Sequence, residues 1–196
     1  MTHHETVERP EAPEGLDVEV VEAPKRLSTG YRETAVEPGR FRATRRWWTP
    51  AVLFMTLFAL FWDGFLVLWY SIAFGFTGMG ALSGIGICFV LFPLGHVAVG
   101  VAITWWVIAT WFNRTVVDVR DGRVTSSVGP IPWPFGRTHA VVLDAVDRFR
   151  VEAKGARRGY GVVAEMKDGE ALRVVAHLRN EGQAGWVAWC LGEQLP

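Results

Sequence analysis

The sequence predicts an α+β membrane protein, with a two-helix transmembrane hairpin followed by a small antiparallel β domain that a C-terminal helix closes. Two observations predict this class. Residues 47–113 carry a single formal charge, Asp63, whereas the segments on either side are highly charged. Such a long apolar stretch is typical of an integral membrane protein. After residue 113, apolar and polar residues alternate, which is the period of a half-buried strand.

The overall composition excludes several classes of function. The chain has 20 Lys and Arg against 20 Asp and Glu, so it gives no reason to expect a nucleic acid or another polyanion as a partner. Its ten tryptophans favour a membrane, because Trp concentrates at membrane–water interfaces. The zinc, phosphate-binding and nucleophile motifs of common enzymes are missing from the sequence. We therefore expect a protein that is not an enzyme, with no catalytic residues, no metal and no cofactor.

The N-terminal region divides into two parts. Residues 1–13 are acidic and contain proline, and we expect them to be disordered. Residues 14–46 form a cytoplasmic segment with two extended-looking runs, GLDVEVVE and GRFRATRRW. These runs are possible edge strands of the later β domain, and the sequence leaves open whether they join it.

The apolar stretch divides at GFTGMGALSGIG, a glycine-rich run that suits a tight turn. Two helices are predicted on either side of it, at about residues 50–74 and 82–112. Each exceeds the ~20 residues that are needed to cross hydrocarbon. Pro93 predicts a kink in the second helix.

The charges beside the helices predict the orientation. Three arginines (Arg42, Arg45 and Arg46) come just before the first helix, and Arg114 follows the second, whereas the turn is uncharged. Because positive residues concentrate on the cytoplasmic side, both termini are expected in the cytoplasm. The prediction is a multi-pass protein of the cytoplasmic membrane.

Residues 114–196 predict the β domain. TVVDVR and RVTSSVG flank Asp121-Gly122, and this dipeptide supplies the positive φ values of a type I′ turn, so a β hairpin is predicted. Four further strand-like runs follow: THAVVL, RFRVEAK, GYGVVAEMK and EALRVVAHL. Asn180 is a predicted N-cap of a last helix. Together they predict a strongly bent antiparallel sheet, or a partly open barrel, that this helix plugs.

Four stretches, in this order, resemble a known family: WDGFLVLWYSIAF, LFPLGHVAVGVAITWW, FNRTVVDVRDGRV and GPIPWPFGR. The family comprises uncharacterised bacterial membrane proteins, in which a two-helix hairpin precedes a small domain resembling bacterial pleckstrin-homology (PH-like) domains. Its loop motif is similar to Gly-Pro-Leu-Pro-Trp-Pro-Gly, but this chain has Ile131 for Leu and Phe135 inserted before Gly136. The resemblance covers about residues 47–180. It implies a bacterial inner-membrane protein with a cytoplasmic PH-like domain, a fold that hosts lipid, peptide and protein binding alike.

Asp63 lies inside the first predicted helix, in LFWDGFLVLWY. A charge in hydrocarbon costs about 2.5–3.5 kcal/mol, so a partner is expected. From Met79, at the centre of the turn, Asp63 is sixteen residues away and His96 seventeen, which predicts equal depth in an antiparallel hairpin. We therefore expect an intramembrane polar pair of Asp63 and His96. Three roles stay open: a bond that fixes helix register, a surface that recruits another membrane subunit, and a proton or ion relay.

Two loops of the β domain are candidate contact sites. GPIPWPFGR either holds its tryptophan against the sheet or dips into the headgroup layer. Its candidate membrane- or partner-contact residues are Pro130, Pro132, Trp133, Pro134, Phe135 and Arg137. KGARRGYG is either a solvated hairpin tip or a site for an anionic lipid or acidic partner. Its candidate anionic-lipid contacts are Lys154, Arg157 and Arg158.

The sequence therefore predicts a non-enzymatic inner-membrane protein that presents a PH-like cytoplasmic domain to a protein partner or to lipid headgroups. The alternative is an accessory or assembly subunit that docks onto a larger membrane complex through its helical hairpin. A third hypothesis is proton or ion transfer through Asp63 and His96. The expected partners are the lipid bilayer and a membrane or cytoplasmic protein, with a homo-oligomer left open and no nucleic acid.

Overall fold

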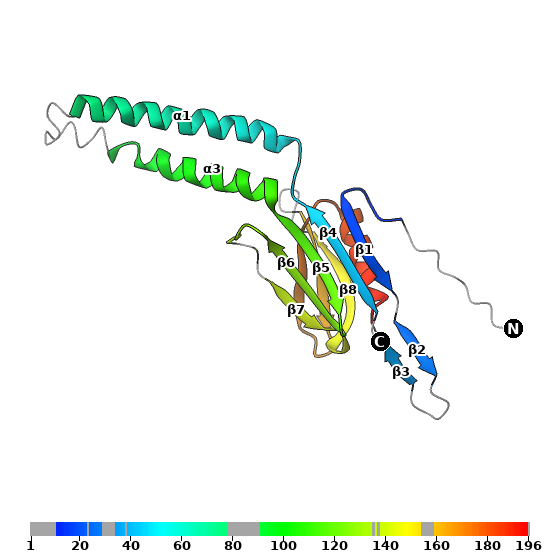
Figure 1. Cartoon of the computed structure of the whole chain (residues 1–196). Helices are drawn as coiled ribbons and strands as arrows, with labels where there is room; N and C mark the ends of the chain where they lie inside the picture. Colours follow the sequence, from blue (N-terminus) through cyan, green and yellow to red (C-terminus); the bar gives the residue numbers. More distant parts are fainter. Residues whose placement is uncertain are drawn as a thin grey trace. The chain divides into compact units, whose positions relative to one another are not determined.

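The computed structural model describes residues 11–22, 24–28, 34–37, 39–77, 91–134, 136, 138–153 and 159–195 (Figure 1). The chain forms two compact units. Residues 47–113 make one, which we call the helical hairpin, and residues 1–46 together with 114–196 make the other, the β unit. The helical hairpin is therefore an insertion within the chain of the β unit.

The helical hairpin contains α1 (Ala51–Thr77) and α3 (Leu94–Phe112), which pack against each other. Both are long and apolar enough to cross a membrane. The contact between them is made by small and branched side chains. Val52, Ala59 and Val107 are buried there, and Met55 and Ile103 pack against them.

The second helix departs from the predicted range of 82–112. Phe92 and Pro93 form a turn, and Pro93 is the N-cap of α3, which begins at Leu94. The ring of proline removes a backbone donor and clashes with the preceding helical turn, so the helix is interrupted here: Leu91 is helical, Phe92 and Pro93 form a turn, and the helix resumes at Leu94. The earlier part of the predicted range, residues 82–90, lies outside the described residues.

The β unit contains a five-stranded antiparallel sheet of order β1-β4-β5-β6-β7 and a three-stranded antiparallel sheet of order β10-β9-β8. The larger sheet is formed by β1 (Leu16–Glu22), β4 (Arg40–Arg46), β5 (Arg114–Arg120), β6 (Arg123–Gly129) and β7 (His139–Val142). The smaller is formed by β8 (Val146–Ala153), β9 (Tyr160–Met166) and β10 (Ala171–Leu178). A short 3-10 helix, η1 (Leu143–Ala145), connects the two sheets, and β2 (Lys25–Ser28) pairs with β3 (Thr34–Glu37) as a separate ribbon.

Both extended-looking runs before residue 47 join the larger sheet. β1 is its edge strand, whereas β4 lies between β1 and β5. The alternation of RFRATRR explains why: Phe41 and Ala43 are buried, while Arg40 and Arg42 are exposed. The β4–β5 ladder runs from Phe41↔Val119 to Arg46↔Arg114, so the two strands that lead into and out of the helical hairpin are direct neighbours.

The predicted turn and cap are both confirmed. Asp121 and Gly122 have φ values of 52° and 68°, as a type I′ turn requires, and they connect β5 to β6. The side chain of Asn180 accepts a 2.8 Å hydrogen bond from the backbone N–H of Gln183 and caps α4 (Glu181–Gly192). Local chemistry therefore sets these boundaries.

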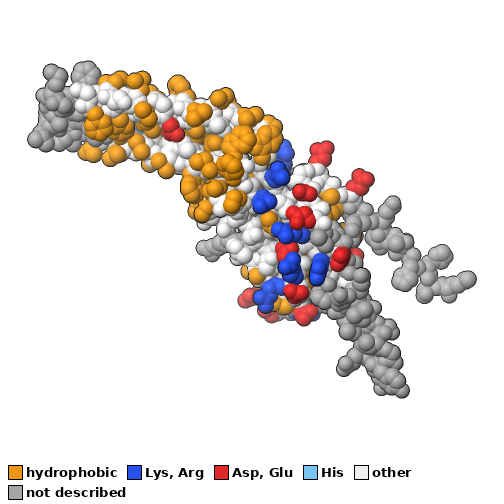
Figure 2. Space-filling model, in the orientation of Figure 1, with side chains coloured by type: hydrophobic (Ala, Val, Ile, Leu, Met, Phe, Trp, Pro, Cys, Tyr) orange, Lys and Arg blue, Asp and Glu red, His pale blue; other side chains and the backbone are white. Residues whose placement is uncertain are grey.

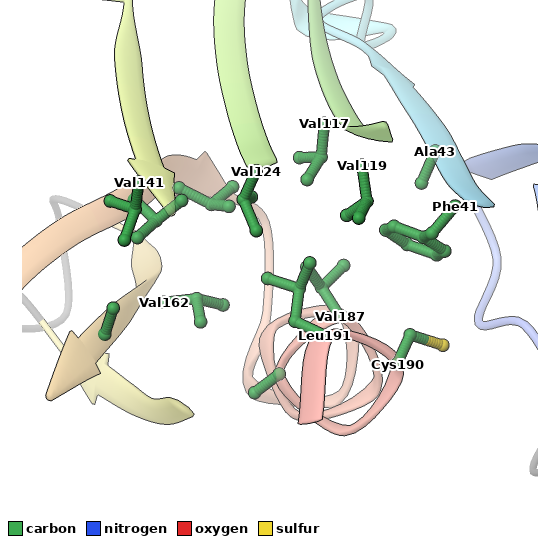
Figure 3. Packing of buried hydrophobic residues seen from close by; sticks show 14 of the residues in the cluster. Phe41, Ala43, Val117, Val119, Val124, Val141, Val162, Val187, Cys190 and Leu191 are labelled. Carbon is green, nitrogen blue, oxygen red and sulfur yellow. The ribbon is translucent and has the colours of Figure 1, made fainter. Parts of the chain in front are cut away.

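The core of the β unit lies between the two sheets and α4 (Figure 3). α4 contributes Val187, Cys190 and Leu191, each at most 1% exposed, and the strands contribute mostly valines. Figure 3 shows these side chains directed toward one another from β4, β5, β6, β7, β9 and α4. The predicted α+β class is confirmed: the described residues combine three α-helices with the two antiparallel sheets.

An ion-pair cluster on β8 and β9 predicts how stability depends on pH. A hydrogen bond from Arg148, together with the charges of Arg148 and Arg150, lowers the pKa of Glu165 below its usual value. A lowered folded-state pKa stabilises the fold above the unfolded pKa, and this contribution disappears as the pH falls through the folded pKa. Glu165→Gln should therefore lower the urea midpoint at pH 7 and have a smaller effect at pH 3.

Glu170→Gln is the matched control, since Glu170 is exposed and forms no ion pair within the described part of the chain. It should change the midpoint little at either pH. A Glu165→Gln effect that is equally large at both pH values would contradict the ion-pair explanation.

Candidate functional site

A polar cluster lies within the otherwise apolar helical hairpin, around Asp63 on α1. The hydroxyl of Thr104 on α3 donates a 2.7 Å hydrogen bond to Oδ2 of Asp63. Both residues are half-buried. This bond satisfies one carboxylate oxygen, and the described residues provide no hydrogen bond to the other, Oδ1.

Gly100, one turn before Thr104 on α3, makes room for the carboxylate. A Cβ at position 100 would lie 2.9 Å from Oδ1 of Asp63, 3.1 Å from the Trp62 ring and 3.2 Å from Leu66. The 2.9 Å contact is shorter than real Cβ atoms show and the other two are tighter than most, so a larger residue here would push the Asp63 carboxylate, Trp62 and Leu66 aside. Gly100 and Thr104 are four residues apart, and they therefore present one face of α3 to Asp63.

The predicted pair of Asp63 and His96 is not what the structure brings together. The imidazole of His96 stacks on the indole of Trp62 with ring centroids 5.7 Å apart, and Trp62 donates a 3.1 Å hydrogen bond to the backbone carbonyl of His96. Asp63 instead contacts α3 at Gly100 and Thr104, which lie one and two turns beyond His96. Thr104 is about 12 Å along the helix from His96.

The residue count from Met79 does not reproduce this contact. Counting residues from the turn measures depth only if both segments are continuous helices with the same rise per residue. Phe92 and Pro93 interrupt the helix, and residues 78–90, over which the count also runs, lie outside the described residues. The described residues show no hydrogen bond between Asp63 and His96, so a proton or ion relay through them stays a prediction.

The proline-rich loop begins where β6 ends, and Gly129 at that end pairs with Arg114. Its prolines at 130, 132 and 134 are exposed, while Trp133 is half-buried. The Trp133 carbonyl accepts a 2.9 Å hydrogen bond from Gly136, which closes a tight turn. Phe135 and Arg137 lie outside the described residues, so the prediction that this loop contacts a membrane or partner stays a prediction.

The second predicted contact loop cannot be placed in the same way. Lys154, Arg157 and Arg158 lie outside the described residues. The ends of the loop are described: Ala153 on β8 pairs with Tyr160 on β9, and Gly159 adopts a φ of 72°. A Cβ at Gly159 would lie 2.7 Å from the carbonyl oxygen of Leu178, so the loop returns beside the end of β10.

The structure also shows a basic cluster at the end of β4 and the start of β5. In the sequence, its arginines indicate only the orientation of the chain. The guanidinium of Arg45 donates a hydrogen bond to the backbone carbonyl of His177, whose φ is 63°. Burial, and then the nearby charge of Arg179, lower the pKa of Arg45. Arg46 and Arg114 pair across β4 and β5 next to it, and both are exposed. The sequence signal was the arginine-rich run RFRATRR, but the His177 contact is 132 residues away in the chain.

The described part of the chain contains no group of three or more His, Cys, Asp or Glu side chains placed to hold a metal ion. Comparison with protein-family models gave no match, and comparison with curated proteins gave none either.

Proposed function

We propose that this protein is a non-enzymatic membrane protein whose helical hairpin anchors a PH-like binding domain, the β unit, at the cytoplasmic surface. The observation that supports it best is the place of the insertion. The helical hairpin leaves the β unit at the end of β4 and returns at the start of β5, and these strands are paired neighbours. Two connections at one end of a sheet would hold that end at the surface of the membrane.

The exposure of the helices supports membrane insertion. Only 17% of the most apolar stretch of α1, and 22% of the most apolar stretch of α3, is buried within the structure. Large apolar side chains such as Phe54, Phe61 and Val67 are about 70% exposed, and Figure 2 shows apolar side chains covering the visible face of the helical hairpin. A soluble protein rarely exposes so large an apolar surface, whereas lipid would cover it.

The arrangement of the strands supports a PH-like domain. Four strands from β4 to β7 follow one another in the sheet, three more from β8 to β10 form the second sheet, and α4 packs against the second sheet and completes the core. We place the binding surface at the end of the larger sheet where β4 ends and β5 begins. Fold alone assigns no ligand, so the ligand must come from the chemistry at that end.

Arg46 and Arg114 suggest anionic lipid headgroups as the ligand. They directly precede and follow the helical hairpin, both are exposed, and neither forms an ion pair with any described residue. Arginines beside a membrane span attract anionic lipids by about 1 kcal/mol each. Arg120 and Arg123 are also a paired, exposed set, but they lie at the other end of β5 and β6, about 20 Å away.

Cysteine labelling tests the anchor and its orientation. Cys190 is buried, so once Cys88 is replaced, little labelling of the native cysteines is expected. Gly75→Cys, near the end of α1, should react with an impermeant maleimide in sealed right-side-out vesicles, and Lys167→Cys, between β9 and β10, should react only in inverted vesicles. The proposal fails if both react from the same side, or if alkaline carbonate extracts the protein from the membrane.

Native mass spectrometry tests the lipid ligand. The protein purified in mild detergent should retain phosphatidylglycerol in preference to phosphatidylcholine. Replacing Arg46 and Arg114 with Gln should reduce this preference about thirtyfold, whereas the same change at Arg120 and Arg123 should not. Equal losses in both double variants would show a general charge effect and contradict a headgroup site.

A second candidate function is an accessory subunit that docks through the helical hairpin. One observation favours it: the Asp63 carboxylate has a single neutral hydrogen-bond donor and an unbonded oxygen within the described residues.

A further inference from the structure

We infer that Asp63 is the contact point for a transmembrane helix of a second protein, one that carries a Lys or Arg at the middle of its span. The inference rests on the proposed membrane insertion of the helical hairpin and names the partner chemistry for docking through it. It follows from the depth of Asp63, from its incomplete neutralisation and from the shape of the surface beside it.

Asp63 is the central residue of the apolar span Ala51–Gly75. Twelve residues separate it from each end, which is about 18 Å of helix on either side. Neither lipid headgroups nor the arginines that flank the helical hairpin in the chain can reach this depth with a side chain. A cation for Asp63 must therefore come from within the hydrocarbon layer.

The helical hairpin itself supplies no such cation. Among the described residues, its only donor to the carboxylate is the neutral hydroxyl of Thr104. Residues 47–113 contain no Lys or Arg. Since a buried carboxylate in a membrane is costly unless a charge or strong donor compensates it, the site is incomplete without a partner.

A second copy of this chain does not fit the same site. Its own carboxylate would repel Asp63, and its residues 47–113 bring no Lys or Arg. Its His96 lies one to two turns along α3 from the Asp63 contacts and is stacked on Trp62. The complement of a mid-membrane carboxylate is a basic side chain at the same depth, and that chemistry belongs to a different protein.

The surface beside Asp63 allows a helix to approach. Gly64 is exposed, and a Cβ added to it would meet nothing within 4 Å. Leu60 and Val67, one turn before and after on the same side, are 67% and 68% exposed. A glycine between two exposed apolar residues is the arrangement that lets transmembrane backbones pack closely. In Figure 2 a red group is visible within the orange surface of the helical hairpin, whose only acidic residue is Asp63.

Designed transmembrane peptides test this contact. The full chain, labelled with a donor fluorophore, is reconstituted in phosphatidylcholine vesicles with acceptor-labelled poly-Leu helices whose central residue is Lys or Leu. The central-Lys peptide should associate about tenfold more tightly than the central-Leu peptide, the size that one strong interhelical contact gives. A third peptide, with Lys moved two turns from the centre, should associate like the Leu peptide.

Variants of the chain separate charge from shape. Asp63→Asn should remove the preference for the Lys peptide, and Gly64→Leu should weaken binding of all central-Lys helices by blocking close approach. Gly75→Leu is the matched control, because Gly75 is also exposed with open space around it, and binding should be unchanged. Equal affinity for Lys and Leu peptides, or self-association of the chain that Asp63→Asn abolishes, would overturn the inference. Resistance to carbonate extraction is measured on the same vesicles, so failure of insertion is distinguishable from failure of docking.

Discussion

The β unit is expected to fold without its helical hairpin when Trp47 is joined to Asn113 through Asn-Gly, whereas residues 114–196 alone are expected to remain unfolded. The backbone N–H of Trp47 donates a 3.1 Å hydrogen bond to the carbonyl of Asn113, just beyond the Arg46↔Arg114 pair. A hydrogen-bonded pair is the position that a two-residue type I′ turn closes. The joined chain would therefore keep the β4–β5 register.

The fragment 114–196 would lose hydrogen bonds and core contacts together with the N-terminal strands. Without β4, the backbone groups of β5 lose their partners along one entire edge, and Val117 and Val119 lose Phe41 and Ala43 from the core. Gln183, which is 1% exposed, would also lose the carbonyl of Glu14, to which its side chain donates a 2.7 Å hydrogen bond. An unpaired buried amide and an open core together exceed the few kcal/mol of stability typical of a small domain.

Amide proton dispersion in a two-dimensional NMR spectrum distinguishes the outcomes. The joined chain should give dispersed peaks and a single cooperative urea transition, and the 114–196 fragment should give neither. Because both polypeptides lack α1 and α3, removal of the apolar helices cannot explain a difference between them. A cooperatively folded fragment would mean that β4 is dispensable and that the helical hairpin merely precedes an independent domain.

The parts of this fold that the sequence predicts are those with local causes. Asp121-Gly122 sets a type I′ turn by its own φ preference, and Asn180 caps α4 through a bond to a residue three positions later. The two apolar helices follow from composition alone. In each case the residues that determine the element lie within a few positions of one another, so no knowledge of tertiary contacts is needed.

The parts that sequence reasoning missed depend on distant partners. β4 and β5 are adjacent in space, but the whole helical hairpin separates them in the chain, and the alternation of RFRATRR does not say which strand it joins. Counting residues from the turn placed His96 opposite Asp63, whereas the hydrogen bond to Asp63 comes from Thr104, because a count assumes one continuous helix and Phe92 and Pro93 interrupt it. Gly100 and Thr104, four residues apart, were the available sequence signal for the Asp63 contact. A small residue followed four positions later by Thr is also common in apolar helices that hold no carboxylate.

Phe41→Ala is expected to cost the β unit about 3–5 kcal/mol of unfolding free energy, the range for deleting a large buried aromatic ring. Phe41 is fully buried, and its ring centroid lies 6.0 Å from that of Trp186 on α4. The ring therefore connects the strand that leads into the helical hairpin with the helix that closes the core, and its removal leaves a cavity that both elements line. Val142→Ala, at a 44% exposed position on β7, should change the same free energy by less than about 0.5 kcal/mol.

Urea unfolding of the joined chain measures both values. Hydrogen exchange in the full-length protein in detergent gives a second reading, because peptides from β4, β5 and α4 should lose protection together while those from α1 do not. Since β4 carries Phe41 and continues directly to residue 47, this separation would show that the core of the β unit is stable independently of the helical hairpin. A Phe41→Ala loss below about 1 kcal/mol would place the ring outside the cooperative core, and the core assigned to β4 would then have to be redrawn.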